Sequence, residues 1–159
     1  MELPVRLRSA KELYQYSCDN GFGKGFGKNW GLRNFALVEK RLEPDEAAFL
    51  TFVGLHRFHS MSAHQRNFAY AITNRRILMA QSRSFWRTRF ESVPLNAIMS
   101  LSFDSDNTIA VMKIMLEKDN ITIGMSCDCA GALSARLTEL LPLIQELAQG
   151  LCGGEEQEQ

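Results

Sequence analysis

Basic side chains dominate the residues of this chain that could do chemistry. Between residues 47 and 90 there are seven arginines and all three histidines, but no aspartate or glutamate. The arginines are Arg57, Arg66, Arg75, Arg76, Arg83, Arg87 and Arg89, and the histidines are His56, His59 and His64. Guanidinium groups bind carboxylates and phosphates through paired hydrogen bonds. This segment therefore predicts a positive surface for an acidic peptide, an anionic membrane or another anion.

A second interpretation of the arginines stays open. Residues 91 to 128 reverse the charge balance, with six carboxylates against Lys113 and Lys118, although the whole chain has a formal net charge of zero. The arginines of the first segment could pair with these later carboxylates inside the fold. In that case they would stabilise the structure and would not bind a ligand.

Catalytic and metal chemistry have little support in the sequence. No serine lies in a nucleophile-elbow motif. If residues 56 to 58 are strand, His56 and His59 point to opposite faces, and no cysteine or carboxylate lies near them to complete a metal site. Cys127 and Cys129 lie at the start of a predicted helix, where we expect them to be small buried residues that cap the core. We therefore expect a protein that is not an enzyme, with no metal site and no cofactor.

The glycine-rich stretch GFGKGFGK, residues 21–28, resembles a phosphate loop only in composition. Phe22 occupies the place of the first glycine of a P-loop, and Asn29 follows where serine or threonine is required. The dinucleotide spacing fails as well, and no strand precedes the loop. We expect a mobile hinge whose Phe22 and Phe26, together with Trp30, form a candidate interface with another molecule.

Alternation and helical spacing predict the elements that position these residues. Helices are expected over residues 9–16, 30–42 and 129–149, the last with a stripe of leucines and a kink at Pro142. Seven strands are expected within residues 46–58, 68–73, 75–80, 86–91, 100–103, 109–117 and 121–126. If Trp86, Thr88 and Phe90 face the core, Arg87 and Arg89 project from the opposite face. Leu137, Leu140, Leu141 and Ile144 are expected to enter the core.

Two motifs carry a family resemblance. The sequences AITNRRILM, residues 71–79, and FESVPLNAI, residues 90–98, resemble the signature of bacterial pleckstrin-homology-like (PH-like) domains of the YokE-like kind. The resemblance covers residues 46–150. It implies an α+β fold in which a seven-stranded antiparallel sandwich, or partly open barrel, is capped by a C-terminal amphipathic helix. We divide the chain into an N-terminal helical extension with the glycine-rich loop (1–43), a PH-like domain (44–152) and a disordered acidic tail (153–159).

The resemblance also implies where a ligand would bind. In PH-like folds that bind anionic headgroups, the site lies between the first and third hairpin loops. Here that region contains His59, His64, Arg66, Arg83 and Arg87, with Arg89 on the adjoining strand. The basic pattern of eukaryotic inositide-binding domains is absent, because Arg66 stands alone before the strand that begins at Phe68.

These observations predict a non-enzymatic interaction module that docks a protein partner or associates with itself. The alternative is weak binding of anionic membrane headgroups through the arginine-rich sheet edge. We expect a homo-oligomer and no nucleic-acid ligand, because the alternating pattern buries the aromatic rings that would stack on bases. The chain has no signal-peptide segment and no apolar run of membrane-spanning length, so we expect a cytoplasmic location.

Overall fold

A computed structural model of the chain describes residues 2–23, 26–83 and 87–157. Its elements in chain order are α1 (Ala10–Asp19), α2 (Lys28–Arg41), β1 (Ala48–His56), β2 (Asn67–Thr73), β3 (Arg76–Ser82), β4 (Thr88–Pro94), the short 3-10 helix η1 (Leu95–Ala97), β5 (Ser100–Ser105), β6 (Ala110–Met115), β7 (Asn120–Met125) and α3 (Cys127–Gln157). The predicted α+β PH-like fold is confirmed, with the N-terminal helices and the long C-terminal helix in place.

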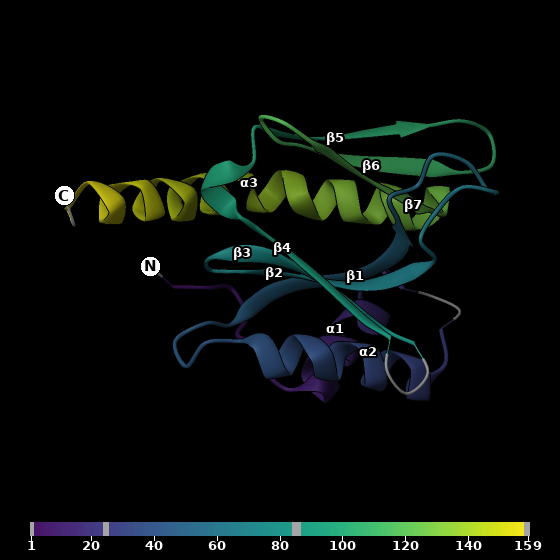
Figure 1. Cartoon of the computed structure of the whole chain (residues 1–159), viewed down its shortest axis with the longest axis horizontal. Coiled ribbons are helices and arrows are strands. Elements are labelled where there is room, and N and C mark those ends of the chain that lie inside the picture. Colours follow the sequence, from purple (N-terminus) through teal and green to yellow (C-terminus); the bar gives the residue numbers. More distant parts are fainter. Residues whose placement is uncertain (1, 24–25, 84–86, 158–159) are drawn as a thin grey trace.

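The strands form one antiparallel sheet in the order β4-β3-β2-β1-β7-β6-β5. This continuous open sheet agrees with the partly open barrel of the prediction: β1 pairs with β7 at Leu55 and His56 and so connects the two halves. The sheet bends at this junction, so that β5 and β6 lie above α3 and β1–β4 lie below it (Figure 1). The pairing of β1 with β7 is short because the two strands diverge at the bend.

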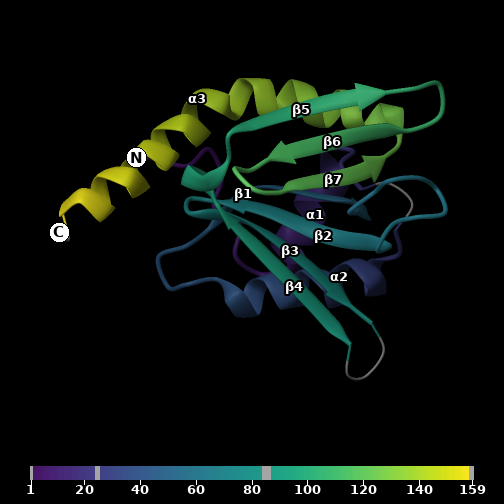
Figure 2. The same cartoon turned by 45° about the horizontal axis from the view of Figure 1, so that its top comes forward.

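Helix α3 covers the concave side of the bent sheet. Leu133, Leu137 and Ile144 are buried there, among the aromatic and aliphatic side chains of the sheet, and Leu140 is half-buried against the same core. The predicted core positions of Leu137 and Ile144 are thus confirmed. Leu141 was expected beside them but keeps 41% of its surface exposed. The helix continues through Pro142, and its axis changes direction along its second half (Figure 2).

Helices α1 and α2 cover the opposite, convex side of the sheet. A capping box starts α1, because the Ser9 side chain accepts the Glu12 N–H while the Glu12 carboxylate accepts the Ser9 N–H. Leu13, Phe35 and Val38 are fully buried against small and aliphatic residues of β1, β2 and β3. The N-terminal extension thus packs on its own sheet, which consequently has a core on each face.

The glycine-rich loop joins α1 to α2 and is anchored to the sheet edge. Phe22 is 2% exposed in the main core, and its carbonyl oxygen accepts the N–H of Val53 at 2.9 Å. Phe26 is half-buried, and its ring stacks on Trp30 with centroids 4.7 Å apart. Phe22 is therefore unavailable to another molecule, which corrects its assignment to the interface, whereas Phe26 and Trp30 remain partly exposed.

The C-terminal helix runs further than the sequence suggested. It continues through Gly153 and Gly154 and ends at Gln157, within the segment that was expected to be a disordered tail. Residues 158 and 159 lie outside the described part of the chain. Within the described residues no helix combines the length and apolar character needed to cross a membrane.

Candidate functional site: an arginine cluster at the hairpin loops

Four of the predicted site residues lie close together at one end of the sheet. The meander of β1 to β4 brings the β1–β2 loop, which contains Arg66, beside the β3–β4 loop, which Arg83 and Arg87 flank. The Arg83 N–H donates to the Arg87 carbonyl at 3.0 Å, and this bond closes the second hairpin. Arg89 lies two residues further along β4, opposite Gln81 of β3.

Amide side chains hold the two loops in register. Gln81 donates from Nε2 to the carbonyl oxygens of Gln65 (3.0 Å) and Asn67 (3.1 Å), which ties β3 to the end of the β1–β2 loop. Arg89 donates to Oε1 of the same Gln65 at 3.2 Å. The buried Asn34 of α2 accepts the N–H of Ser82 at 2.7 Å and so fixes the end of β3 to the helix. These hydrogen bonds fix the strand ends and loops from which the arginines project.

The cluster has no carboxylate to neutralise it in the part of the chain that the structure describes. There, no aspartate or glutamate oxygen lies within 4.0 Å of Arg66, Arg83, Arg87 or Arg89. Desolvation, followed by the positive charges of Arg89, Arg66 and Arg87, lowers the pKa of Arg83. Like charges held together in this way create a positive potential that favours an anion.

The other arginines of this basic segment are paired. Arg57 contacts Glu91 at 2.7 Å and Asp119 at 3.3 Å, Arg75 contacts Asp45, and Arg76 contacts Glu46 at 3.0 Å. Both interpretations of the arginines thus apply, each to a different set. Pairing with carboxylates accounts for three of them, and the cluster at the hairpin loops contains the other four.

A small cavity of about 220 Å³ lies within the cluster, between β3, the start of β2 and Trp30. Two buried polar atoms of its lining residues, Arg83 Nε and Gln81 Oε1, have no hydrogen-bond partner among the described residues. A buried donor without an acceptor destabilises the fold unless a ligand or water completes it. An oxygen of a phosphate or carboxylate is a negatively charged acceptor, which is the kind of partner that the Arg83 donor lacks among the described residues.

The remaining predicted site residues lie nearby, with differing exposure. His59 is exposed on the β1–β2 loop, while the half-buried His64 stacks on Phe58 with ring centroids 6.2 Å apart. The predicted faces of β4 are correct for Phe90, which packs on the core beneath α2 under Arg41, while Arg89 is exposed. Thr88, expected in the core, is exposed, and Val93 reaches the main core from the other face. Trp86 lies outside the described residues.

Sequence reasoning missed a buried polar network beside the cluster. His56 has no exposed surface; its Nδ1 lies 2.9 Å from the Tyr70 hydroxyl and its Nε2 contacts Glu91. Burial lowers the pKa of His56, and the Glu91 carboxylate opposes that shift. The burial of His56 makes this network a structural connection between β1 and β4. Its partners are 14 and 35 residues from His56 in sequence, so no local motif could reveal it.

Comparison with known proteins identifies the family. The model of the bacterial PH domain matches residues 42–131, more than half of the chain. The chain belongs to the bacterial PH domain family. The matched segment contains the strands and loops that carry the arginine cluster and ends within the first turns of α3. PH-like domains are in general non-catalytic modules that interact with proteins or lipids.

Solved structures similar to this PH domain are distant in sequence. One is a pleckstrin-homology domain from Shewanella amazonensis, with 15% identity, a TM-score of 0.47, and coverage of 67% of this chain and 94% of that one. Another is a protein with a pleckstrin-homology domain from Shewanella loihica, with 16% identity, a TM-score of 0.42, and coverage of 62% and 85%. No curated protein matches the chain.

Proposed function

We propose that this PH domain is a non-catalytic module that binds anionic membrane surfaces through Arg66, Arg83, Arg87 and Arg89. The observation that carries the proposal is the contrast among the arginines of one segment. Three are neutralised by carboxylates, while these four, at the ends of two adjacent hairpins, meet none among the described residues. Like charges held close together repel one another, and an anionic ligand relieves that repulsion.

The chemistry of the cluster fits a lipid headgroup. Each basic side chain near an anionic leaflet contributes ~1 kcal/mol, so four provide ~4 kcal/mol at low ionic strength. Met61 supports this orientation, because it projects from the β1–β2 loop with 67% of its surface exposed, at the same end as Arg66. An apolar side chain beside a cationic cluster is the arrangement that peripheral membrane contacts use.

Vesicle sedimentation tests the proposal. Vesicles of pure phosphatidylcholine are compared with vesicles that also contain phosphatidylglycerol, at low and at high salt. The full chain should pellet with the anionic vesicles only, and salt should release it because the contact is electrostatic. Equal recovery with both vesicle types at low salt would overturn the proposal.

A matched pair of variants locates the contact. The double variant Arg66→Gln with Arg87→Gln removes two charges from exposed side chains that have no salt bridge to a described residue. The control, Lys40→Gln with Lys118→Gln, removes two charges from exposed sites on α2 and the β6–β7 turn. The first pair should lose most of the binding, and the control should retain it.

Self-association is a second candidate, supported by the other end of the molecule. The second half of α3 extends beyond the sheet (Figure 1). Leu141 is 41% exposed on α3, while its neighbours Leu140, Leu143 and Leu147 are half-buried against the chain's own core. An exposed leucine on a long helix can pack against a second copy of the same helix. Sedimentation velocity of the wild type and Leu141→Lys would detect this: a concentration-dependent dimer that the variant abolishes supports it, and a monomer throughout excludes it.

A further inference from the structure

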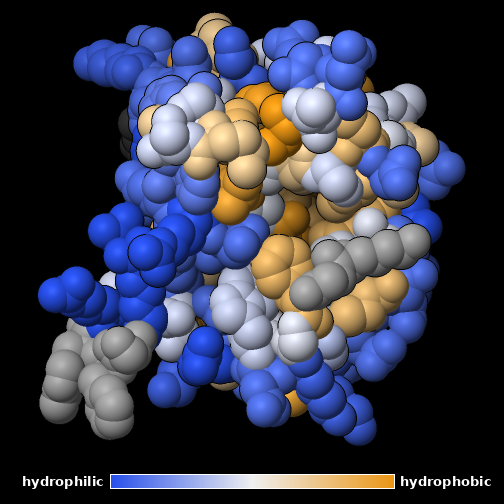
Figure 3. All heavy atoms as spheres, turned by 90° about the vertical axis from the view of Figure 1, so that its right-hand side faces the viewer, coloured by the Kyte–Doolittle hydropathy of each residue, from blue (hydrophilic) through white to orange (hydrophobic). Residues whose placement is uncertain are grey.

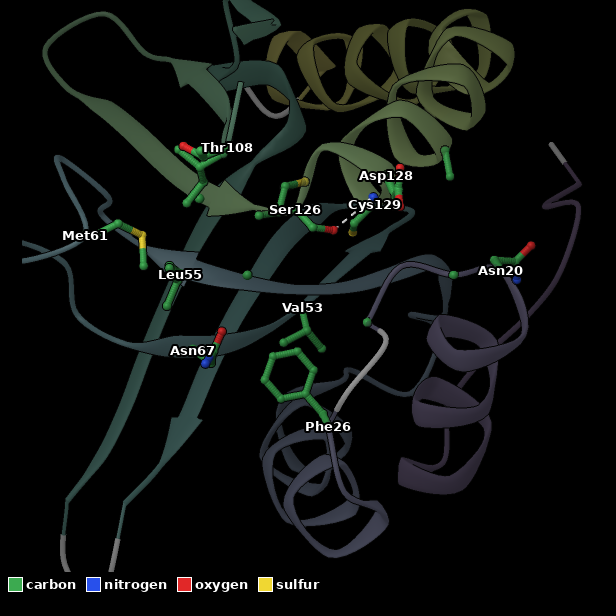
Figure 4. Close-up of a pocket in the computed structure, with 17 residues that line it drawn as sticks. Asn20, Phe26, Val53, Leu55, Met61, Asn67, Thr108, Ser126, Asp128 and Cys129 are labelled. Atoms are coloured by element: carbon green, nitrogen blue, oxygen red, sulfur yellow. Dashed lines mark hydrogen bonds between the residues drawn. The ribbon is translucent and has the colours of Figure 1, made fainter. Parts of the chain in front are cut away.

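A large apolar cavity opens on the same face of the molecule as the arginine cluster. Its volume is about 790 Å³, within the ~300–1,000 Å³ that small-molecule sites occupy. Apolar side chains such as Phe26, Val53, Leu55 and Met125 line it (Figure 4). Figure 3 shows the corresponding apolar hollow, with hydrophilic surface beside it.

The bend in the sheet creates this cavity. Strand β1 pairs with β7 only at its C-terminal end, at Leu55 and His56, and before that point the free edge of β1 is occupied at Val53, whose N–H donates to the Phe22 carbonyl at 2.9 Å. At the junction a Cβ on Gly54 would lie 2.5 Å from the Ile123 side chain, so only glycine allows the strands to approach. The cavity occupies the space between the diverging strands, the loop and the start of α3.

The cavity and the arginine cluster adjoin one another. Asn67 lines both the large cavity and the small one that contains Arg83. Phe26 of the large cavity stacks on Trp30 of the small one, at 4.7 Å between ring centroids. The apolar cavity and the cationic site therefore share a wall, and Arg83 Nε in that site has no hydrogen-bond partner among the described residues.

The two cavities differ in the charge of the side chains around them. Asp128, at the start of α3, is exposed on the wall of the large cavity, away from the side where Asn67 adjoins the small cavity (Figure 4), and its carboxylate disfavours an anion there. The arginines favour an anion at the other side. A molecule with one negative end and one apolar end fits this distribution in a single orientation.

We propose that this PH domain binds a single-chain anionic amphiphile, with its carboxylate or phosphate on Arg83 and Arg66 and its aliphatic chain in the large cavity. This inference rests on the proposed function, since it uses the same arginines. It goes further by adding an apolar site that a membrane surface alone does not require. The ligand class is a fatty acid or a lysolipid with an anionic head.

Calorimetric titration with short fatty acids tests the inference. Decanoate, dodecanoate and tetradecanoate, each below its micelle concentration, are titrated into the full chain. Affinity should rise by up to about fourfold for each added methylene that enters the cavity. Dodecyl phosphate distinguishes the two head chemistries, and dodecanol, which has no charge, should bind at least tenfold more weakly than dodecanoate.

Two alanines of α3 provide matched variants. Ala132 is exposed on the cavity wall, so Ala132→Phe should fill the cavity and abolish the dependence on chain length. Ala135 is also exposed on α3 but does not line the cavity, so Ala135→Phe should behave as the wild type. Thermal melting checks that both variants fold.

The outcomes separate this inference from the proposed function. Affinity that does not depend on chain length, or an Ala132→Phe variant that binds as the wild type does, would overturn the cavity assignment and leave vesicle binding unaffected. Dodecanol that binds as tightly as dodecanoate would overturn the joint use of the arginines. Loss of vesicle binding in Arg66→Gln with Arg87→Gln, with fatty-acid binding unchanged, would also contradict the shared site.

Discussion

The two ends of the β2–β3–β4 meander use arginine in opposite ways. At the β2–β3 turn, Arg76 binds the buried Glu46 at 3.0 Å, and Arg75 binds Asp45. At the β3–β4 end, Arg83 and Arg87 meet only other arginines among the described charged groups. Both sets of arginines lie at the ends of the same strands, so a carboxylate could have paired with either set. The difference suggests that the paired end maintains the structure and the unpaired end serves a ligand.

Glu91 lies at the boundary between the paired and the unpaired arginines. It lies on β4 only two residues from Arg89, yet its carboxylate contacts Arg57 at 2.7 Å and the ring of His56. Burial raises the pKa of Glu91, but hydrogen bonds from Arg57 and His56 outweigh it and lower the pKa overall. The nearest carboxylate on the strand is therefore already engaged, and the cluster keeps its charge.

The largest effect is expected from breaking the paired end. Glu46→Ala removes a fully buried carboxylate that also accepts the Thr73 hydroxyl at 2.6 Å, and it leaves Arg76 without its partner. Loss of one partner of a buried pair costs ~3–5 kcal/mol. Urea unfolding should show a decrease of this size, whereas Arg87→Gln at the unpaired end should change the free energy of unfolding by less than ~0.5 kcal/mol. Similar losses in the two variants would remove the distinction between the ends.

A smaller effect is expected from acid. Burial alone would raise the pKa of Glu46, but hydrogen bonds from Arg76, Thr73 and the backbone lower it below its ordinary value. A carboxyl with a lowered pKa in the fold stabilises the protein above the ordinary value of ~4.3, and this contribution is lost as the pH falls through that region. The wild type should therefore lose stability below about pH 5.

A variant of the same group checks the acid prediction. Urea unfolding between about pH 6 and pH 3 should show a shallower decline for Glu46→Gln, because its amide does not titrate in this range. Arg87→Gln should retain the slope of the wild type. A Glu46→Gln variant with an undiminished slope would mean that other carboxyls account for the acid sensitivity.

The sequence predicted the elements well because their signals are local. Alternation over a few residues located the strands, and the polar residues around Arg83 indicated a hairpin turn. Adjacent hairpins of an antiparallel meander place their loops at the same end, so the grouping of Arg66 with Arg83 and Arg87 could be predicted. The sequence could not tell which arginines were neutralised, because Arg57 reaches Glu91 and Asp119 across 34 and 62 residues.

The apolar contacts show the same limit. Phe22 lies in a loop of glycines and lysines, where the composition predicts exposure, yet it is buried against the free edge of β1. The large cavity depends on where β1 separates from β7, and no residue pattern indicates that point. Leu141 has the spacing of a core leucine but is 41% exposed, because it lies on the outer side of α3 while Leu140 and Ile144 of the same turns face the core.

The most direct test of the unpaired end compares two single substitutions that each remove one positive charge. Arg87→Gln changes the cluster, and Arg75→Gln changes the exposed pair with Asp45 at the opposite end of the meander. Partition of both variants onto vesicles that contain phosphatidylglycerol is measured at low salt. Arg87→Gln should bind about fivefold more weakly, as expected for ~1 kcal/mol per basic residue, and Arg75→Gln should bind as the wild type does. Equal weakening of the two variants would show that only net charge matters, and would contradict a binding site at the arginine cluster.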